Sequence, residues 1–242
     1  MKKVIVDNVS LQFRMYHDGA SSMKEFFANI VRKNKKKHYT DFLALQGVSF
    51  SVNDGERLGI IGRNGAGKST LLRTISRIYE PTVGRVEVHG RVAPLLDIGA
   101  GFHPEFTGRE NIYFNGAFLG YSKEQLREIE KEVIAFAELE DFIDSPVKYY
   151  STGMYMRLAF SLATTVHPDV LILDELFVGG DASFVQRGKE RMNKMIDRAS
   201  VMILVSHDPS LLRSVCDRYI WLDHGKLIAD GDVSVLDAYI AS

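Results

Sequence analysis

The stretch Gly62-Arg63-Asn64-Gly65-Ala66-Gly67-Lys68-Ser69 decides how this chain folds, because it fills every fixed position of the G-x-x-x-x-G-K-[ST] phosphate-binding loop. An apolar run, Leu58 to Ile61, precedes the loop and predicts a buried strand, and apolar residues at helical spacing follow it. A strand, a glycine-rich loop and a helix in this order direct backbone N–H groups toward phosphates. The alternative, a glycine-rich turn with a chance lysine, is disfavoured by these flanks.

The residues of the loop have separate tasks. The glycines let successive N–H groups converge on the phosphates, Lys68 is expected to reach the β- and γ-phosphates, and the Ser69 hydroxyl to ligate Mg²⁺. The predicted nucleotide-binding residues of the loop are Gly62, Arg63, Asn64, Gly65, Ala66, Gly67, Lys68, Ser69 and Thr70. Because kinases, GTPases and ATPases share such loops, the motif alone leaves all three open.

A second apolar run narrows that choice. Val170-Leu171-Ile172-Leu173-Asp174-Glu175 predicts a buried strand of a parallel sheet that ends in two carboxylates. Asp174 is expected to hold Mg²⁺, and Glu175 to orient and partly deprotonate the attacking water. A solvated turn is the alternative for an isolated Asp-Glu pair, and the four preceding aliphatic residues disfavour it. A carboxylate that activates water favours hydrolysis over phosphoryl transfer to another substrate.

A third motif, Tyr150-Ser151-Thr152-Gly153-Met154, precedes the amphipathic stretch Arg157 to Ala163. A Ser/Thr pair and a glycine that open a helix predict a second anion-binding helix N-terminus. One anion-binding helix N-terminus is enough for one γ-phosphate, so the second site is expected to serve a partner molecule.

Together, these motifs carry a resemblance. The order of phosphate loop, Tyr-Ser-Thr-Gly-Met, Leu-Ile-Leu-Asp-Glu, Gly-Asp and Ser-His resembles the nucleotide-binding subunit of ABC transporters across essentially the whole chain. The resemblance implies that Ser151, Thr152, Gly153 and Met154 of one copy contact ATP held by a second copy, in a head-to-tail dimer. It also implies that His207 senses the γ-phosphate, although a histidine at a strand end is by itself more often structural. Asp181 would couple the two sites.

The apolar patterns predict an α/β fold. Strands are expected at 4–13, 42–52 and 84–92, and a core sheet resumes at 169 and ends with a hairpin at 218–222 and 226–229. Residues 107–165 have a helical pattern, in which Ser122 caps one helix. The resemblance implies an ABC-type P-loop ATPase core with an antiparallel β-subdomain and this inserted helical subdomain. One nucleotide-binding domain, 1–242, is expected, without a C-terminal carbohydrate-binding domain.

Composition limits the partners. The formal net charge is −1, which disfavours nucleic acid as a partner. The single cysteine, Cys216, excludes an internal disulfide and is expected to be a small buried hydrophobe in a reducing cytoplasm. No signal peptide is expected, and no apolar run in the sequence reaches the length that crosses a bilayer. A transport pore would therefore come from another chain.

The segment between Phe13 and Phe42 is an insertion relative to a plain ABC subunit. Apolar residues at one-face helical spacing predict an extra amphipathic helix over 21–34, and basic residues continue to Lys37. Two interpretations stay open. The helix packs on its own domain with a solvated basic end, or it meets an anionic membrane surface or a lipid pyrophosphate.

A further segment, Leu95 to Ile112, resembles the corresponding stretch of the ABC subfamily that exports lipid-linked polysaccharides such as O-antigens, teichoic acids and capsules, and the extra helix belongs to the same resemblance. Asp97 stands at about the position of the usual Mg²⁺-contacting glutamine, so a coupling role for it is open. The family also stacks an aromatic side chain on adenine. Phe13 fits that position best and Tyr16 is the alternative.

The sequence thus predicts an ATP- and Mg²⁺-dependent ATPase subunit of an exporter of lipid-linked polysaccharide, with O-antigen favoured. It would work as a homodimer with an integral-membrane permease, at the cytoplasmic face of the membrane. The ATPase subunit of an ABC importer or of a small-molecule exporter is the first alternative. A non-transport ABC regulator that acts on DNA or ribosomes is the second, and the near-neutral charge disfavours it.

Overall fold

A mainly parallel sheet forms the centre of the molecule. The computed structural model describes residues 1–16, 39–96, 98–175 and 181–242. The sheet order is β5 (Val92–Leu95), β6 (Val170–Asp174), β7 (Val201–Val205), β3 (Arg57–Ile61), β8 (Arg218–Asp223) and β9 (Lys226–Gly231). The β8–β9 pairing is antiparallel and the other pairings are parallel. The aliphatic runs of β6 and β7 are buried because both faces of the sheet are covered.

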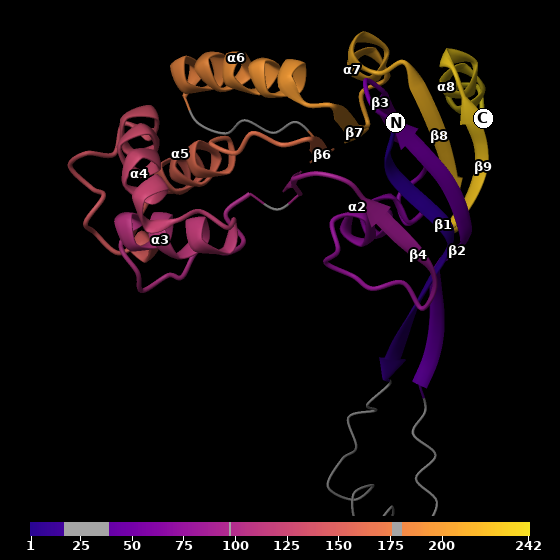
Figure 1. The fold of residues 1–242 in the computed structure, drawn as a ribbon, viewed down its shortest axis with the longest axis horizontal. Helices are drawn as coiled ribbons and strands as arrows, with labels where there is room; N and C mark the ends of the chain where they lie inside the picture. Colours follow the sequence, from indigo (N-terminus) through magenta and orange to yellow (C-terminus); the bar gives the residue numbers. More distant parts are fainter. Residues whose placement is uncertain (17–38, 97, 176–180) are drawn as a thin grey trace, which may run out of the picture.

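A second, antiparallel sheet lies beside it, in the order β2 (Tyr39–Asn53), β1 (Lys2–Tyr16) and β4 (Val83–Val88). β1 and β2 extend beyond the expected strands and form a long ribbon, in which Phe13 lies opposite Phe42 (Figure 1). The predicted helix over 21–34 and Asp97 lie outside the described residues.

The strand material expected at 84–92 is divided between the two sheets. β4 ends at Val88 and pairs with β1, whereas β5 begins at Val92 and pairs with β6. The chain turns at Gly90, whose φ is 110°. A Cβ at Gly90 would lie 2.5 Å from the Cβ of Asp169, so the close approach also requires glycine.

The helices α3 (Gly108–Phe118), α4 (Lys123–Ala137) and α5 (Thr152–Ala163) gather at one side of the molecule, between β5 and β6 in sequence (Figure 1). They enclose a core of their own that includes Ile112, Val133 and Leu158. The predicted Ser122 cap of α4 is confirmed, and Gln125 completes a capping box. Within the part of the chain that the structure describes, no helix combines the length and apolar character needed to span a bilayer.

The remaining helices cover the central sheet. They are α2 (Lys68–Ile75), α6 (Ala182–Arg198), α7 (Pro209–Val215) and α8 (Val233–Ile240). One core joins α2 and the antiparallel sheet to the β-strand residues of one face, and a second core joins α6, α7 and α8 to the other face. Cys216 lies in the second core, and burial raises the pKa of its thiol to about 12. The expectation of a buried, hydrophobic cysteine is therefore confirmed.

Candidate functional site

The phosphate loop connects β3 to α2 and borders a cavity of about 510 Å³. Of the predicted nucleotide-binding residues, Asn64, Gly65, Gly67, Lys68, Ser69 and Thr70 line this cavity. They are joined there by Asp174, Glu175 and His207 from the ends of β6 and β7. The carboxyl ends of parallel strands meet at one edge of the sheet, where α/β proteins bind ligands.

Glycines give the loop its shape. Gly62, Gly65 and Gly67 have φ values of 150°, 80° and 103°. Residues with a side chain rarely adopt such positive φ values. A Cβ at Gly62 would lie 2.3 Å from the carbonyl oxygen of Leu222, so this position also lacks space. Gly67 is the N-cap residue of α2, and it makes no side-chain hydrogen bond because glycine has no side chain. The first N–H groups of α2 are therefore left without a side-chain cap from this position, and they lie at the cavity.

Lys68 is buried, although its ammonium is charged. Its Nζ donates to the carbonyl oxygens of Gly62, at 2.7 Å, and Arg63, at 3.0 Å. Burial lowers the pKa of the ammonium below its ordinary value, while the charges of Asp174 and Glu175 oppose that shift. The loop thus holds a cation at the cavity wall, where it can meet phosphate oxygens.

The metal-binding residues that the sequence predicts lie in direct contact. The Ser69 hydroxyl donates to Oδ2 of Asp174, with 2.8 Å between the two oxygens. A hydroxyl and a carboxylate are hard oxygen donors of the kind that Mg²⁺ prefers. This donor set fits a Mg²⁺ ion that also binds phosphate oxygens.

Glu175 and His207 form a second pair at the cavity. Nε2 of His207 lies 3.6 Å from Oε1 of Glu175, and both side chains are exposed. The backbone of Glu175 has a φ of 55°, in the left-handed region, and its N–H donates to the carbonyl of Val205 at 2.9 Å. Non-glycine residues rarely adopt this conformation, and functional sites are among the places where they do. Glu175 is thereby held beside Asp174 with its carboxylate directed to an open space.

The second helix N-terminus lies elsewhere. Ser151 caps α5, and its Oγ accepts a hydrogen bond from the N–H of Met154 at 3.2 Å. Ser151 and Thr152 are exposed, and a Cβ at Gly153 would meet only Oγ of Ser151, at 3.9 Å, among the residues the structure describes. None of the residues 151–154 is among the described residues that line the nucleotide cavity. Within one chain, the two N-termini are not brought together.

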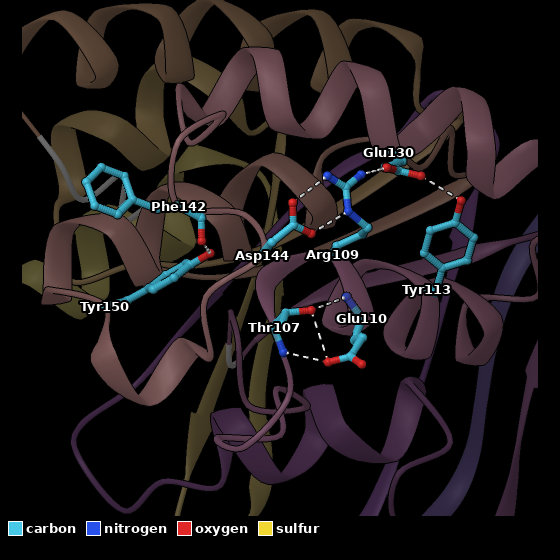
Figure 2. A network of polar contacts seen from close by, with 8 residues as sticks. All are labelled: Thr107, Arg109, Glu110, Tyr113, Glu130, Phe142, Asp144 and Tyr150. Atoms are coloured by element: carbon cyan, nitrogen blue, oxygen red, sulfur yellow. Dashed lines mark hydrogen bonds and ion pairs between the residues drawn. The ribbon is translucent and has the colours of Figure 1, made fainter.

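A polar network joins α3 and α4 to the segment that precedes Ser151 in the sequence (Figure 2). Arg109 of α3 binds the carboxylate of Asp144 in a bidentate manner, at 2.7 and 3.1 Å, and also pairs with Glu130 of α4. The hydrogen bond to Asp144 raises the pKa of the Arg109 guanidinium and lowers that of the Asp144 carboxyl. The hydroxyl of Tyr150 donates to the carbonyl of Phe142 at 2.8 Å.

The same figure shows how α3 begins, with the Thr107 and Glu110 capping box (Figure 2). The loop before Ser151 is tied to α3 by the pairing of Asp144 with Arg109, which in turn contacts α4 through Glu130.

Asp181 caps α6. Its Oδ1 accepts from the N–H of Phe184 at 3.0 Å, and Oδ2 lies 3.4 Å from the guanidinium of Arg157. The N–H of Phe184 lowers the pKa of the Asp181 carboxyl, and the charge of Arg157 adds to this shift. Sequence reasoning gave Arg157 no role, because a basic residue in an amphipathic helix does not reveal its distant partner.

Phe13 is placed differently from the expectation. Its ring packs edge-on against Tyr79, with the centroids 5.4 Å apart, and it is not among the described residues that line the cavity. Phe42, directly opposite Phe13 in the ribbon, lines the cavity instead and is 49% exposed. The Tyr16 side chain lies outside the description. The pairing of β1 with β2 would have identified Phe42, but the sequence alone does not give their register.

The strand–loop–helix site at the edge of the parallel sheet defines a P-loop nucleotide-binding protein. Residues 45–178 match the family described as ABC transporter. The chain belongs to that family and is an ATP-binding, ATP-hydrolysing transporter subunit.

Relatives with assigned names are similar over most of this chain. It is 44% identical over 206 residues to the O-antigen export system ATP-binding protein RfbB of Myxococcus xanthus, which covers 85% of this chain and 47% of that protein. It is 39% identical over 220 residues to RfbB of Klebsiella pneumoniae, covering 91% and 89%. The teichoic acids export protein TagH of Lactococcus lactis is 40% identical over 212 residues, covering 88% and 45%. The chain spans about half the length of the first and third of these proteins.

Solved structures share the fold. An ATP-binding cassette solved as a dimer in a post-hydrolysis state with ADP and phosphate has a TM-score of 0.68 at 21% identity, and covers 95% of this chain and 98% of its own. The predicted ABC-type α/β fold is thereby confirmed.

Proposed function

We propose that this chain is the ATPase subunit of an ABC exporter that moves lipid-linked polysaccharide, with O-antigen the favoured polymer. The observation that carries the ATPase chemistry is the meeting of Lys68, Ser69, Asp174 and Glu175 at one cavity. The polymer is inferred from the names of the similar proteins, which are O-antigen and teichoic acid export proteins.

Five side chains that line the cavity have a proposed place in hydrolysis. Ser69 and Asp174 would hold Mg²⁺, which when bound offsets the phosphate charge. The Lys68 ammonium binds β- and γ-phosphate oxygens, and the uncapped N-terminus of α2 adds further N–H donors. The Glu175 carboxylate orients the attacking water and accepts its proton. His207, whose Nε2 lies 3.6 Å from Oε1 of Glu175, donates a hydrogen bond to the γ-phosphate.

Two copies complete the site. Ser151, Thr152, Gly153 and Met154 are proposed to contact the nucleotide held by the partner copy. The exposure of Ser151 and Thr152 and the open space at Gly153 support this, because a phosphate can approach the first turn of α5 there. Phe42 is proposed to stack on adenine in place of Phe13, since its exposed ring lines the cavity.

The permease is proposed to dock beside α3 and α5. A cavity of about 210 Å³ there is lined by apolar side chains that include Ile98, Phe102 and Leu162. Phe118 stands at its edge and is 77% exposed, and Phe114 packs on Phe118 with the centroids 5.0 Å apart. Exposed aromatic side chains beside an apolar hollow favour a helix of a membrane partner. The chain would thus lie at the cytoplasmic face of the membrane, held through the permease.

Glu175→Gln tests the ATPase chemistry. Because the amide keeps the shape but cannot accept the proton, kcat should fall by about 100-fold or more, while ATP–Mg²⁺ affinity should change little. Steady-state hydrolysis and binding of a fluorescent ATP analogue measure the two quantities. Glu140→Gln, an exposed glutamate at another surface, is the matched control and should keep the wild-type rate. Equal turnover in wild type and Glu175→Gln would remove Glu175 from this role.

Complementation tests the substrate. In the source organism, deletion of the gene should leave lipid-linked polymer inside the cell, and surface polysaccharide should return with the wild-type gene but not with Glu175→Gln. If the deletion leaves surface polysaccharide unchanged, another ABC transporter or an ABC regulator becomes the better assignment. A permease gene beside this one supports transport, whereas co-purification with nucleic acid supports the regulator.

A further inference from the structure

A second cavity, of about 320 Å³, lies between α4, α6 and the segment that follows α5. None of the residues that line it lines the nucleotide cavity. Its wall includes Pro168, just before β6, and Arg198, the last residue of α6 before β7. The amino ends of β6 and β7 therefore border this cavity, whereas the nucleotide site lies at their carboxyl ends.

The inner part of this cavity is apolar. Val166 and Met195 are almost fully buried in the core that α6 shares with the central sheet, and Phe136 packs against the same core. An apolar surface of this kind contacts the carbon atoms of a ligand. The inner wall therefore suits an organic molecule better than a bare inorganic ion.

The outer wall is basic. Four residues of α6 that line the cavity follow one another at intervals of four, three and four residues, a spacing that places them on one stripe of the helix: Arg187, Arg191, Lys194 and Arg198. Two of these cations are already compensated. Arg191 binds Glu132 of α4 at 2.6 Å, and Arg187 pairs with Glu138, the C-cap of α4.

The other two cations have no such compensation. Lys194 and Arg198 are exposed, and neither forms an ion pair with any residue that the structure describes. Glu190, also in the wall, accepts a hydrogen bond from Gln186 at 3.0 Å instead. In addition, Nε of Arg187 is buried without a hydrogen-bond partner among the described residues, and a buried donor is destabilising until an acceptor reaches it. The wall thus has more cations and donors than acceptors.

We propose that this cavity binds an organic phosphate monoester, whose phosphate group is held by Lys194 and Arg198 and whose organic part lies against Phe136. A phosphate monoester has a charge close to −2 at neutral pH and three strong acceptor oxygens, which suit two cations and a further donor better than a carboxylate does. The site requires neither the dimer nor the transport function proposed above. Soluble metabolites and lipid headgroups both offer this group, so the experiment includes a probe of each kind.

Calorimetric titration with phenyl phosphate tests the chemistry of the ligand. Benzoate, which has one charge, and inorganic phosphate, which has no apolar part, should each bind about tenfold more weakly. The titration is repeated with Lys68→Ala, whose phosphate loop lacks its cation, and the affinity for phenyl phosphate should stay the same. Co-sedimentation with vesicles of phosphatidic acid, compared with vesicles of phosphatidylcholine, tests a lipid headgroup as the source of the phosphate monoester.

Variants test the position of the site. Lys194→Gln and Arg198→Gln should each raise the Kd of phenyl phosphate by about tenfold, and the double variant by about 100-fold, because each change removes a charge-assisted hydrogen bond. The matched control is Lys123→Gln/Lys189→Gln, which removes the same charge at two exposed positions outside the cavity and should change Kd by less than about twofold. Both double variants should hydrolyse ATP at the wild-type rate, which also shows that they fold.

The outcomes separate the ligand sources. Phenyl phosphate binding that is lost only in the Lys194 and Arg198 variants supports the site with a soluble ligand. Vesicle binding with the same pattern of losses, in the absence of phenyl phosphate binding, supports the site with a lipid headgroup. The proposal is overturned if neither probe binds, if the control double variant loses binding equally, or if Lys68→Ala abolishes it. Equal affinities for phenyl phosphate and either benzoate or inorganic phosphate would overturn it as well.

Discussion

The N-termini of α2 and α5 are both suited to binding anions, but they differ in their caps and in the residues around them. α2 follows Gly67, which provides no side-chain cap, and it opens onto a cavity with Lys68 and Asp174 in the wall. α5 follows Ser151, whose own hydroxyl caps it at an exposed surface. The first N-terminus is surrounded by the groups that a nucleotide needs, whereas the described residues that line this cavity include none of the residues 151–154 at the second. This difference is the basis of the proposal that α5 completes a site whose other half belongs to another molecule.

Mixing two inactive variants tests this difference most strongly. Lys68→Ala should remove nucleotide binding, because the N-terminus of α2 loses its cation. Gly153→Asp should bind nucleotide normally but hydrolyse it barely, because a carboxylate at the start of α5 repels phosphate. In an equal mixture, half of the dimers are mixed and each keeps one intact site, so about a quarter of the wild-type rate should return. A mixture no more active than its parents would exclude the head-to-tail arrangement.

Replacement of the ribbon aromatics sharpens the description of the α2 site. Phe42→Ala should weaken ATP affinity by about tenfold, since stacking of a base on an aromatic ring contributes about 1–3 kcal/mol. Phe13→Ala is the control, because Phe13 packs on Tyr79 and should affect stability instead. Calorimetric titration with ATP and with inorganic triphosphate separates adenine from phosphate recognition. A larger loss of ATP affinity in Phe13→Ala than in Phe42→Ala would restore the assignment of adenine stacking to Phe13.

Removal of the two serine caps is the test with the smallest expected effect. Ser151→Ala and Ser122→Ala each delete one hydroxyl that accepts from a helix N–H, so each should cost about 1 kcal/mol of stability, or about 2–4 °C in Tm. Only Ser151→Ala should also slow hydrolysis, by several fold, because Ser122 lies at the start of α4, away from any proposed phosphate. Thermal unfolding and ATPase assays give both values. Equal hydrolysis in the two variants would count against a nucleotide contact by Ser151.

Local motifs could be predicted from the sequence, and contacts between distant segments could not. The phosphate loop, the carboxylates after β6 and the capped start of α5 are contiguous, so their residue types give their geometry directly. Residues 84–92 divide between two sheets at Gly90, a division that their sequence pattern does not reveal. Phe42 and Arg157 depend on strand register and on a contact with Asp181, 24 residues away. The assigned roles of the site residues and the extent of the helical subdomain stay predictions.

The buried thiol has a practical consequence for measuring the proposed dimer. Cys216 is the single cysteine of the chain, it is 9% exposed, and its pKa is raised to about 12, so little thiolate forms near neutral pH. A maleimide dye or a nitroxide added to the folded protein should therefore spare it. One cysteine introduced at an exposed position would carry the whole signal, and distances between labels on two copies could be followed through the hydrolytic cycle without first replacing the native residue.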